Sequence, residues 1–236
     1  MSDRRLGRLV PRISRHKFDY EASEFLKDTC PEALCLPMAV PIERIATEVL
    51  KLTILEEHLS EDLSILGQMC FTDGRVEIYD PVEDEYREIL VKAGTMIIDP
   101  KTSHQRNVGS KRNTIAHECF HWTRHRFYHI EAAKLDKDKA FAYRCPTIPK
   151  NDTTQLEWTD EDWMEWQATN IAPRILMPKE TIGQAMEIVL RRGETNPFFR
   201  QELISREGWI IEQVAGIYKV SKQAAQIRLQ ELGYIG

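Results

Sequence analysis

Residues 117–121 read His-Glu-Cys-Phe-His, an H-E-x-x-H pattern whose two histidines are spaced to bind one metal ion. On a helix, residues four apart lie on the same face, one turn or about 6 Å apart. His117 and His121 can therefore hold one Zn²⁺ through their imidazole nitrogens. Glu118, one step round the helix, is placed to hold the water that the metal activates and to accept its proton. The alternative is a surface helix with two solvated histidines.

A third metal ligand has to come from elsewhere in the chain. A metzincin would place Gly at position 124 and His at position 127, but this chain has Arg124 and Phe127, which excludes that class. Glu165 is our candidate, because Ala168 and Ala172 follow it on the same helical face. Small side chains let two helices approach closely. The alternative role for Glu165 is that of a surface acid that complements a helix dipole.

The composition is that of a globular protein without a membrane segment. Of 236 residues, 42% are hydrophobic and 29% are charged, which excludes collagen-like, low-complexity and wholly disordered chains. The longest apolar stretch, residues 33–42, is interrupted by two prolines and is far shorter than the roughly 20 residues that span a bilayer. The basic leader lacks the apolar region of a secretory signal, and the five cysteines are scattered. We therefore expect a cytoplasmic protein with reduced thiols.

The formal net charge of −5 is unevenly distributed along the chain. Residues 1–17 contain six basic side chains and one acidic one, a net +5, so the other 219 residues carry −10. We interpret this leader as a solvated arm, with a nucleic-acid-binding tail as the alternative. An acidic body repels phosphate backbones, which argues against an extended nucleic-acid groove.

The elements around the motif are predicted from hydrophobic periodicity and turn signals. An amphipathic helix begins at Pro41, because proline is tolerated at the first helical position. Runs at 65–71 and 75–79 flank an Asp-Gly pair that favours a tight hairpin turn, and residues 94–98 form another short strand. We expect two or three antiparallel strands. The motif then lies in one helix over about residues 111–129.

Two further helices follow the motif helix. Thr159 is a hydroxyl cap followed three residues later by Asp162, which is typical of a helix start. This helix should continue to about Ala172 and bend or end near Pro173. Residues 179–192 form the next helix.

The last 36 residues, 201–236, read as two short helices joined by a turn at 219–221. Gln223, Gln226 and Arg228 could read DNA bases from the second helix. The segment has four basic and four acidic groups, so it lacks the positive charge of a typical DNA reader. We therefore favour docking or substrate recruitment over DNA binding. The apolar positions that fit a helix-turn-helix core are Ala215, Val220, Ala224 and Ile227.

Two segments resemble motifs of the ImmA/IrrE family of metallo-endopeptidases. Residues 113–121, Asn-Thr-Ile-Ala-His-Glu-Cys-Phe-His, resemble the active-site helix of that family. Residues 165–178 resemble its E-x-x-A-N-x-F-A segment, which is followed by a short apolar stretch and Met-Pro. The resemblance covers roughly residues 40–180. Thr169 stands where the family usually has Asn, and Pro173 where Ala is common.

The resemblance implies an α+β protein with a compact, gluzincin-like zincin domain, in which a small antiparallel sheet packs on the HExxH helix. It implies that His117, His121 and Glu165 bind Zn²⁺, or another divalent metal such as Mn²⁺, and that Glu118 is the general base. It also implies a narrow protein substrate, a helix-turn-helix repressor, whose cleavage relieves repression of a mobile element or of stress genes.

We divide the chain into three parts: a basic N-terminal arm and lead-in at 1–38, the metallopeptidase domain at 39–200, and the helix-turn-helix-like segment at 201–236. Two other functional classes stay open. One is a DNA-binding regulator that uses the C-terminal segment and keeps a vestigial peptidase fold, and the other is a non-catalytic metal-binding module. Glu118 argues against a vestigial site, because metal binding alone does not require it.

Several other side chains lie near the motif in the sequence. His125 and His129 continue the spacing of four, and we expect them at the surface or in support of the ligands, with substrate contact as the alternative. The candidates for oxyanion stabilisation are Tyr128, Tyr143 and His125. Cys119 points away from the histidine face, and we expect it to be a packed core thiol.

Overall fold

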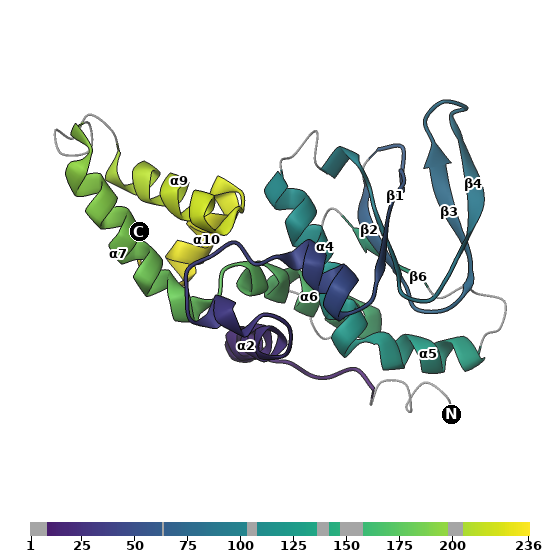
Figure 1. The fold of residues 1–236 in the computed structure, drawn as a ribbon. Coiled ribbons are helices and arrows are strands. Elements are labelled where there is room, and N and C mark those ends of the chain that lie inside the picture. The colour runs from purple at the N-terminus through teal and green to yellow at the C-terminus, as the bar shows by residue number, and fades with distance from the viewer. Residues whose placement is uncertain (1–8, 63, 103–107, 136–141, 147–157, 198–204) are drawn as a thin grey trace.

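The computed structural model describes residues 9–62, 64–102, 108–135, 142–146, 158–197 and 205–236, and the statements below apply to these residues. The strands gather on one side of the molecule and helices form the rest (Figure 1). The predicted α+β class is therefore confirmed. None of the helices in this described part combines the length and the apolar character that crossing a bilayer requires.

A four-stranded sheet lies beside the helix that carries the motif (Figure 1). In spatial order its strands are β1 (Thr53–Glu56), β5 (Thr95–Ile98), β2 (Ile65–Cys70) and β6 (Ala142–Pro146). The strand predicted at 94–98 is confirmed. β2 is antiparallel to both of its neighbours, but β1 runs parallel to β5. The prediction of two or three strands, all antiparallel, is therefore wrong, since this sheet alone has four. The long connection from β1 to β5 allows the parallel pairing, because it returns the chain to the same end of the sheet.

A separate two-stranded ribbon is formed by β3 (Gly74–Asp80) and β4 (Glu85–Val91), which pair antiparallel. The hairpin predicted at the Asp-Gly pair of residues 73–74 is therefore wrong, because β2 and β3 belong to different sheets. The carboxylate of Asp73 instead accepts a hydrogen bond from the backbone N–H of Ala93 at 2.8 Å. This contact closes the open end of the ribbon, where β3 begins and β4 ends, and the turn lies at the other end, between β3 and β4.

The motif lies in α4 (Val108–Arg124), which packs against the sheet and against α6 (Asp160–Leu176). The single helix predicted over 111–129 is interrupted at His125, and α5 (Arg126–Leu135) begins directly after it. Hydrophobic periodicity continues across this point, so it gave no sign of the break. Of the four histidines spaced four residues apart, two therefore lie in α4, His125 lies between the helices, and His129 lies in α5.

The start of α6 follows the prediction closely. Thr159 Oγ1 accepts a hydrogen bond from the N–H of Asp162 at 3.1 Å, and Asp162 Oδ2 accepts one from the N–H of Thr159 at 2.9 Å, which together make a capping box. Pro173 does not end the helix, which continues to Leu176. Proline removes one helical hydrogen bond, but burial of Ile175 and Leu176 in the core offsets that loss.

Residues 9–38 contribute to the same hydrophobic core. Their main element is α2 (Phe18–Thr29), which packs against α6. The ring of Phe18 meets that of Trp166 edge to face, with centroids 4.8 Å apart, and Leu26 is fully buried. Sequence analysis did not predict this helix. Short 3-10 helices flank it, namely η1 (Arg15–Lys17) and η2 (Pro31–Leu34).

Two other predicted helices are confirmed with different ends. The helix expected after Pro41 consists of α3 (Ile42–Arg44) and a π-helical turn, η3 (Ile45–Val49). Ile42 and Ile45 are buried, whereas Val49 at the end of η3 is exposed. The helix α7 (Lys179–Thr195) extends past its predicted end at residue 192.

The two predicted C-terminal helices are α9 (Arg206–Tyr218) and α10 (Lys222–Glu231). Lys219 ends α9 in the left-handed conformation, and Ser221 caps α10 by accepting a hydrogen bond from the N–H of Ala224 at 3.0 Å. These helices share an apolar cluster with α7 at one end of the molecule (Figure 1). Ile227, predicted as part of that core, is half exposed.

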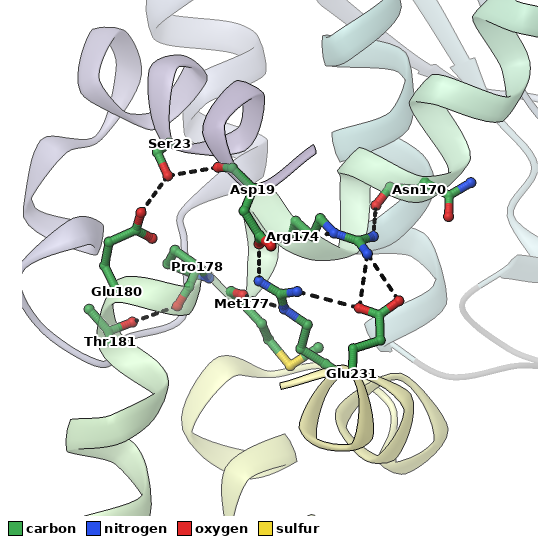
Figure 2. A network of polar contacts seen from close by, with 10 residues as sticks. Asp19, Ser23, Asn170, Arg174, Met177, Pro178, Glu180, Thr181 and Glu231 are labelled. Carbon is green, nitrogen blue, oxygen red and sulfur yellow. Dashed lines mark hydrogen bonds and ion pairs between the residues drawn. The ribbon is translucent and has the colours of Figure 1, made fainter. Parts of the chain in front are cut away.

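A polar network with two buried arginines ties α10 to α2 and α6 (Figure 2). Arg228 of α10 is 2% exposed, donates to the carbonyl oxygen of Met177 at 3.2 Å, and forms ion pairs with Asp19 and Glu231. Arg174 of α6 binds the same Glu231 carboxylate at 3.0 Å. The prediction that Arg228 could read DNA bases is therefore wrong, because its guanidinium is buried inside the protein and already engaged.

Replacing Asp19 with Ala is expected to lower the free energy of unfolding by about 2 kcal/mol, because it leaves Arg228 with one carboxylate fewer. The effect should be smaller than the roughly 3–5 kcal/mol of a fully buried pair, because Asp19 is one-quarter exposed. Urea unfolding measures the change. Asp28→Ala, at an exposed position of the same helix, is the control and should change it little. Equal stabilities of the two variants would contradict this account of the network.

Candidate metal centre

The structure brings His117 and His121 of α4 and Glu165 of α6 together at one buried point. The Nε2 atoms of the two histidines lie 3.0 Å apart. Oε1 of Glu165 lies 2.8 Å from Nε2 of His121 and 3.4 Å from Nε2 of His117. Glu165 is therefore not the surface acid that was its alternative, and the three residues converge as predicted from their spacing.

Close packing of α6 on α4 places Glu165 there. Ala168 and Ala172, one and two turns after Glu165, are fully buried. Because these side chains are small, the axes of α4 and α6 can lie close together. The side chain of Glu165 is then long enough to bring its carboxylate to the two histidines. The capping box at Thr159 fixes the residue at which α6 begins, and so helps to fix the turn of α6 on which Glu165 lies.

The three residues fit a divalent metal in donor type and in spacing. In a tetrahedral Zn²⁺ site with bonds of about 2.0–2.1 Å, neighbouring ligand atoms lie roughly 3.3 Å apart. The distances among the three atoms are 2.8, 3.0 and 3.4 Å. Two imidazoles and one carboxylate are also a donor set of catalytic zinc sites, in which the fourth position stays open for water or substrate.

The charge of the cluster also suits a cation. Burial alone would raise the pKa of Glu165, but the imidazoles of His117 and His121 hold it below its usual range, so the carboxylate is ionised. Burial lowers the pKa of His121, which keeps that ring neutral near pH 7, the form that binds metals. An ionised, buried carboxylate between two imidazoles is a place that a divalent metal can occupy when the rings bind it in their neutral form.

Glu118 is buried beside the cluster with one oxygen unengaged. Its side chain is almost fully buried, and Oε1 has no hydrogen-bond partner within the described ranges. Burial and, less strongly, the charge of Glu165 raise the pKa of Glu118 to about 8, against the opposing effect of His117. A carboxyl group with this pKa can both accept and return a proton near neutral pH.

Gly67 of β2 makes room for the Glu118 carboxylate. A Cβ atom at Gly67 would lie 2.7 Å from Oε1 of Glu118 and 2.6 Å from Cγ2 of Thr114, closer than real contacts allow. Sequence analysis missed this residue. Nothing in the local pattern around Gly67 singles it out, because the contact exists only once β2 and α4 pack together.

His125 and His129 are buried, so the expectation that they lie at the surface is wrong. Nδ1 of His125 lies 3.0 Å from Nδ1 of His121, and Nε2 of His125 lies 3.2 Å from Oε1 of Gln167. His129 stacks on Phe71 with ring centroids 4.1 Å apart, and burial lowers its pKa to about 3. His125 therefore contacts His121, the predicted ligand, and its position is compatible with the supporting role, which stays a prediction.

The remaining predictions around the motif are partly settled. Both nitrogens of His125 are engaged in the interior, so it is not placed to stabilise an oxyanion. Tyr128 is half-buried, and the side chain of Tyr143 lies outside the described residues. Cys119 is fully buried in the core, as predicted, and burial raises the pKa of its thiol.

The raised pKa of Glu118 predicts how stability depends on pH when a chelator removes metal. The folded protein keeps a proton on Glu118 that the unfolded chain releases above pH 4.5, so this group makes the fold less stable as pH rises from about 4.5 to about 8. Glu118→Gln should therefore raise the free energy of unfolding by about 3–5 kcal/mol at pH 8 and change it little at pH 5. Urea unfolding at both pH values measures this. The exposed Glu187→Gln is the control, and an equal effect of Glu118→Gln at the two pH values would contradict the assignment.

Comparison of the chain with protein-family models, with curated proteins and with solved structures gives no match.

Proposed function

We propose that this protein is a metal-dependent endopeptidase. The observation that carries the proposal is one buried cluster that combines two imidazoles and a carboxylate, at ligand distances, with the separate Glu118 carboxyl group beside them. A site that only bound metal would not need Glu118, whose burial with an unpartnered oxygen costs stability. Buried groups with shifted pKa values are concentrated at functional sites. The motif resemblance to the ImmA/IrrE peptidases, which no comparison tests, points to the same activity.

The residues divide the chemistry of peptide hydrolysis between them. His117, His121 and Glu165 would hold the metal, which when bound supplies a Lewis acid that polarises the peptide carbonyl and makes water a stronger acid. Glu118 takes a proton from the attacking water while the oxygen of that water bonds to the carbonyl carbon. When the C–N bond breaks, Glu118 returns that proton to the amine nitrogen, so the carboxylate is regenerated at the end.

Zn²⁺ is the metal we propose. Two histidines and one glutamate, with an open position, are a zinc set. Mn²⁺ or another divalent ion is the alternative, because imidazole and carboxylate ligands also accept these metals.

We further propose that the substrate is a helix-turn-helix transcriptional repressor in the cytoplasm, whose cleavage relieves repression. This step depends on the motif resemblance. The C-terminal helices α9 and α10 are suited to recruiting that substrate, because Gln223, Gln226 and Ile227 are exposed on α10. The rival class, a DNA-binding regulator, is less well supported, because Arg228 is engaged in the interior.

The test is incubation of the Zn²⁺-loaded protein with a small helix-turn-helix repressor encoded beside it, followed by intact-mass analysis. We expect cleavage at one peptide bond, inhibited by a chelator and restored by Zn²⁺. A repressor that stays intact, together with specific retention of duplex DNA at moderate salt, would favour the regulator class instead. A bound metal with neither result would favour a non-catalytic metal-binding module.

A further inference from the structure

A chain of hydrogen-bonding groups extends from the back of His121 to the N-terminal segment. Nδ1 of His121 lies 3.0 Å from Nδ1 of His125, and Nε2 of His125 lies 3.2 Å from Oε1 of Gln167. The amide nitrogen of Gln167 then donates to the carbonyl oxygen of Pro11 at 2.7 Å. His121, His125 and Gln167 are all fully buried, so water does not compete for these contacts.

The contact at Pro11 determines which group donates and which accepts in each of these hydrogen bonds. A carbonyl oxygen only accepts hydrogen bonds, so the NH₂ group of Gln167 must face Pro11, and its Oε1 must face His125. Oε1 also only accepts, so Nε2 of His125 carries a proton. His125 is fully buried, and its ring nitrogens contact His121 and Gln167, neither of which offers a negative charge, so the ring is neutral and its Nδ1 is an acceptor. The donor between the two Nδ1 atoms is therefore the N–H of His121.

Since Nδ1 of His121 carries the proton, the other nitrogen of the ring, Nε2, carries none when the ring is neutral. A neutral imidazole with its proton on Nδ1 presents a lone pair at Nε2, and Nε2 is the atom that faces Glu165 and His117. We propose that His125 and Gln167 are positioning residues that hold His121 in the tautomer that binds metal. The inference depends on the proposed metal site, and it extends that site to Pro11 in the N-terminal segment.

The first test compares two substitutions of the same shape at His125. Asn and Leu branch at the same atom and leave a similar void, but only Asn offers an oxygen acceptor near the former position of Nδ1. Zn²⁺ affinity of the full-length protein is measured by competition with a chromophoric chelator at pH 7.5. We expect His125→Leu to weaken binding by roughly 10- to 100-fold, and His125→Asn to stay within about fivefold of wild type.

The second test removes the next group in the chain. Gln167→Met keeps the length of the side chain but removes the acceptor for Nε2–H of His125. We expect about tenfold weaker Zn²⁺ binding. In the double variant with His125→Leu we expect no further loss beyond about twofold, because both substitutions interrupt one chain. Circular dichroism and thermal unfolding with a chelator present identify any variant that has lost its fold.

The outcomes separate this inference from the metal site itself. If His121→Ala binds Zn²⁺ as tightly as wild type, the metal site is wrong and the inference is overturned with it. If His121→Ala abolishes binding but His125→Asn and His125→Leu lose the same affinity, only the void matters and the positioning role is overturned. Additive losses for His125→Leu and Gln167→Met would also overturn it. If His125→Leu does not fold, the comparison of Gln167→Met with wild type decides.

Discussion

Glu118→Gln is expected to abolish peptide cleavage while the protein still binds its metal. Gln has the size of Glu, and Gly67 leaves room for it, so the surroundings should be preserved. An amide cannot accept the proton of the attacking water, and loss of a positioned general base costs roughly 10²- to 10⁴-fold in rate. The measurement is kcat/KM for cleavage of the repressor, together with metal content.

The control for this experiment is Glu187→Gln, which makes the same change at an exposed position of α7. It should keep the rate and the metal content of wild type. Cleavage by Glu118→Gln within about threefold of wild type would show that another group is the base, since proton transfer by a positioned residue is worth far more. Loss of metal in Glu118→Gln would instead assign Glu118 to the ligands.

Glu165→Gln is expected to weaken Zn²⁺ binding by more than about 100-fold, because residues that merely support a ligand already cost about 10- to 100-fold when replaced. The amide has nearly the same shape but no charge, and the negative charge of Glu165 is what suits the buried cluster to a cation. The affinity is measured by competition with a chromophoric chelator.

The matched control is Glu161→Gln, four residues earlier in the acidic start of α6 and not part of the cluster. If Glu165 acted only as an acid at the helix start, both variants would bind Zn²⁺ equally. That result would leave the cluster without its third ligand. Glu165 would then be an acid that only complements the dipole of α6.

The candidate site could be predicted because its main signals are local. The spacing of His117 and His121 fixes their shared helical face, and the alanines after Glu165 indicate a helix that can approach closely. The cap at Thr159 is also a local pattern, and its two hydrogen bonds are present. The histidine pair and the cap each lie within one helix, whereas the assignment of Glu165 as third ligand also needed the resemblance of both helices to one family.

The failed predictions involve contacts between distant segments. An Asp-Gly pair favours a hairpin turn, but strand pairing depends on the whole sheet, and here β2 pairs with β5 and β6. The position of Arg228 on the second C-terminal helix suggested a possible DNA contact, but Asp19, far away in the sequence, pairs with it. The role of Gln167 likewise depends on Pro11, which no spacing rule connects to it.

The N-terminal region shows how net charge can obscure packing. Residues 1–17 are strongly basic, which suggested a solvated arm. Val10 and Ile13 are nevertheless buried, and Pro11 between them contacts Gln167. The domain boundaries at residues 38 and 200 stay predictions.

The most direct test of the central claim is the metal content of the purified chain and of His121→Ala. We predict about one Zn²⁺ per wild-type chain and almost none in the variant, because removal of one of three protein ligands leaves a buried site that cannot hold the ion. The same metal content in both proteins would contradict the proposed centre, and the peptidase assignment that depends on it.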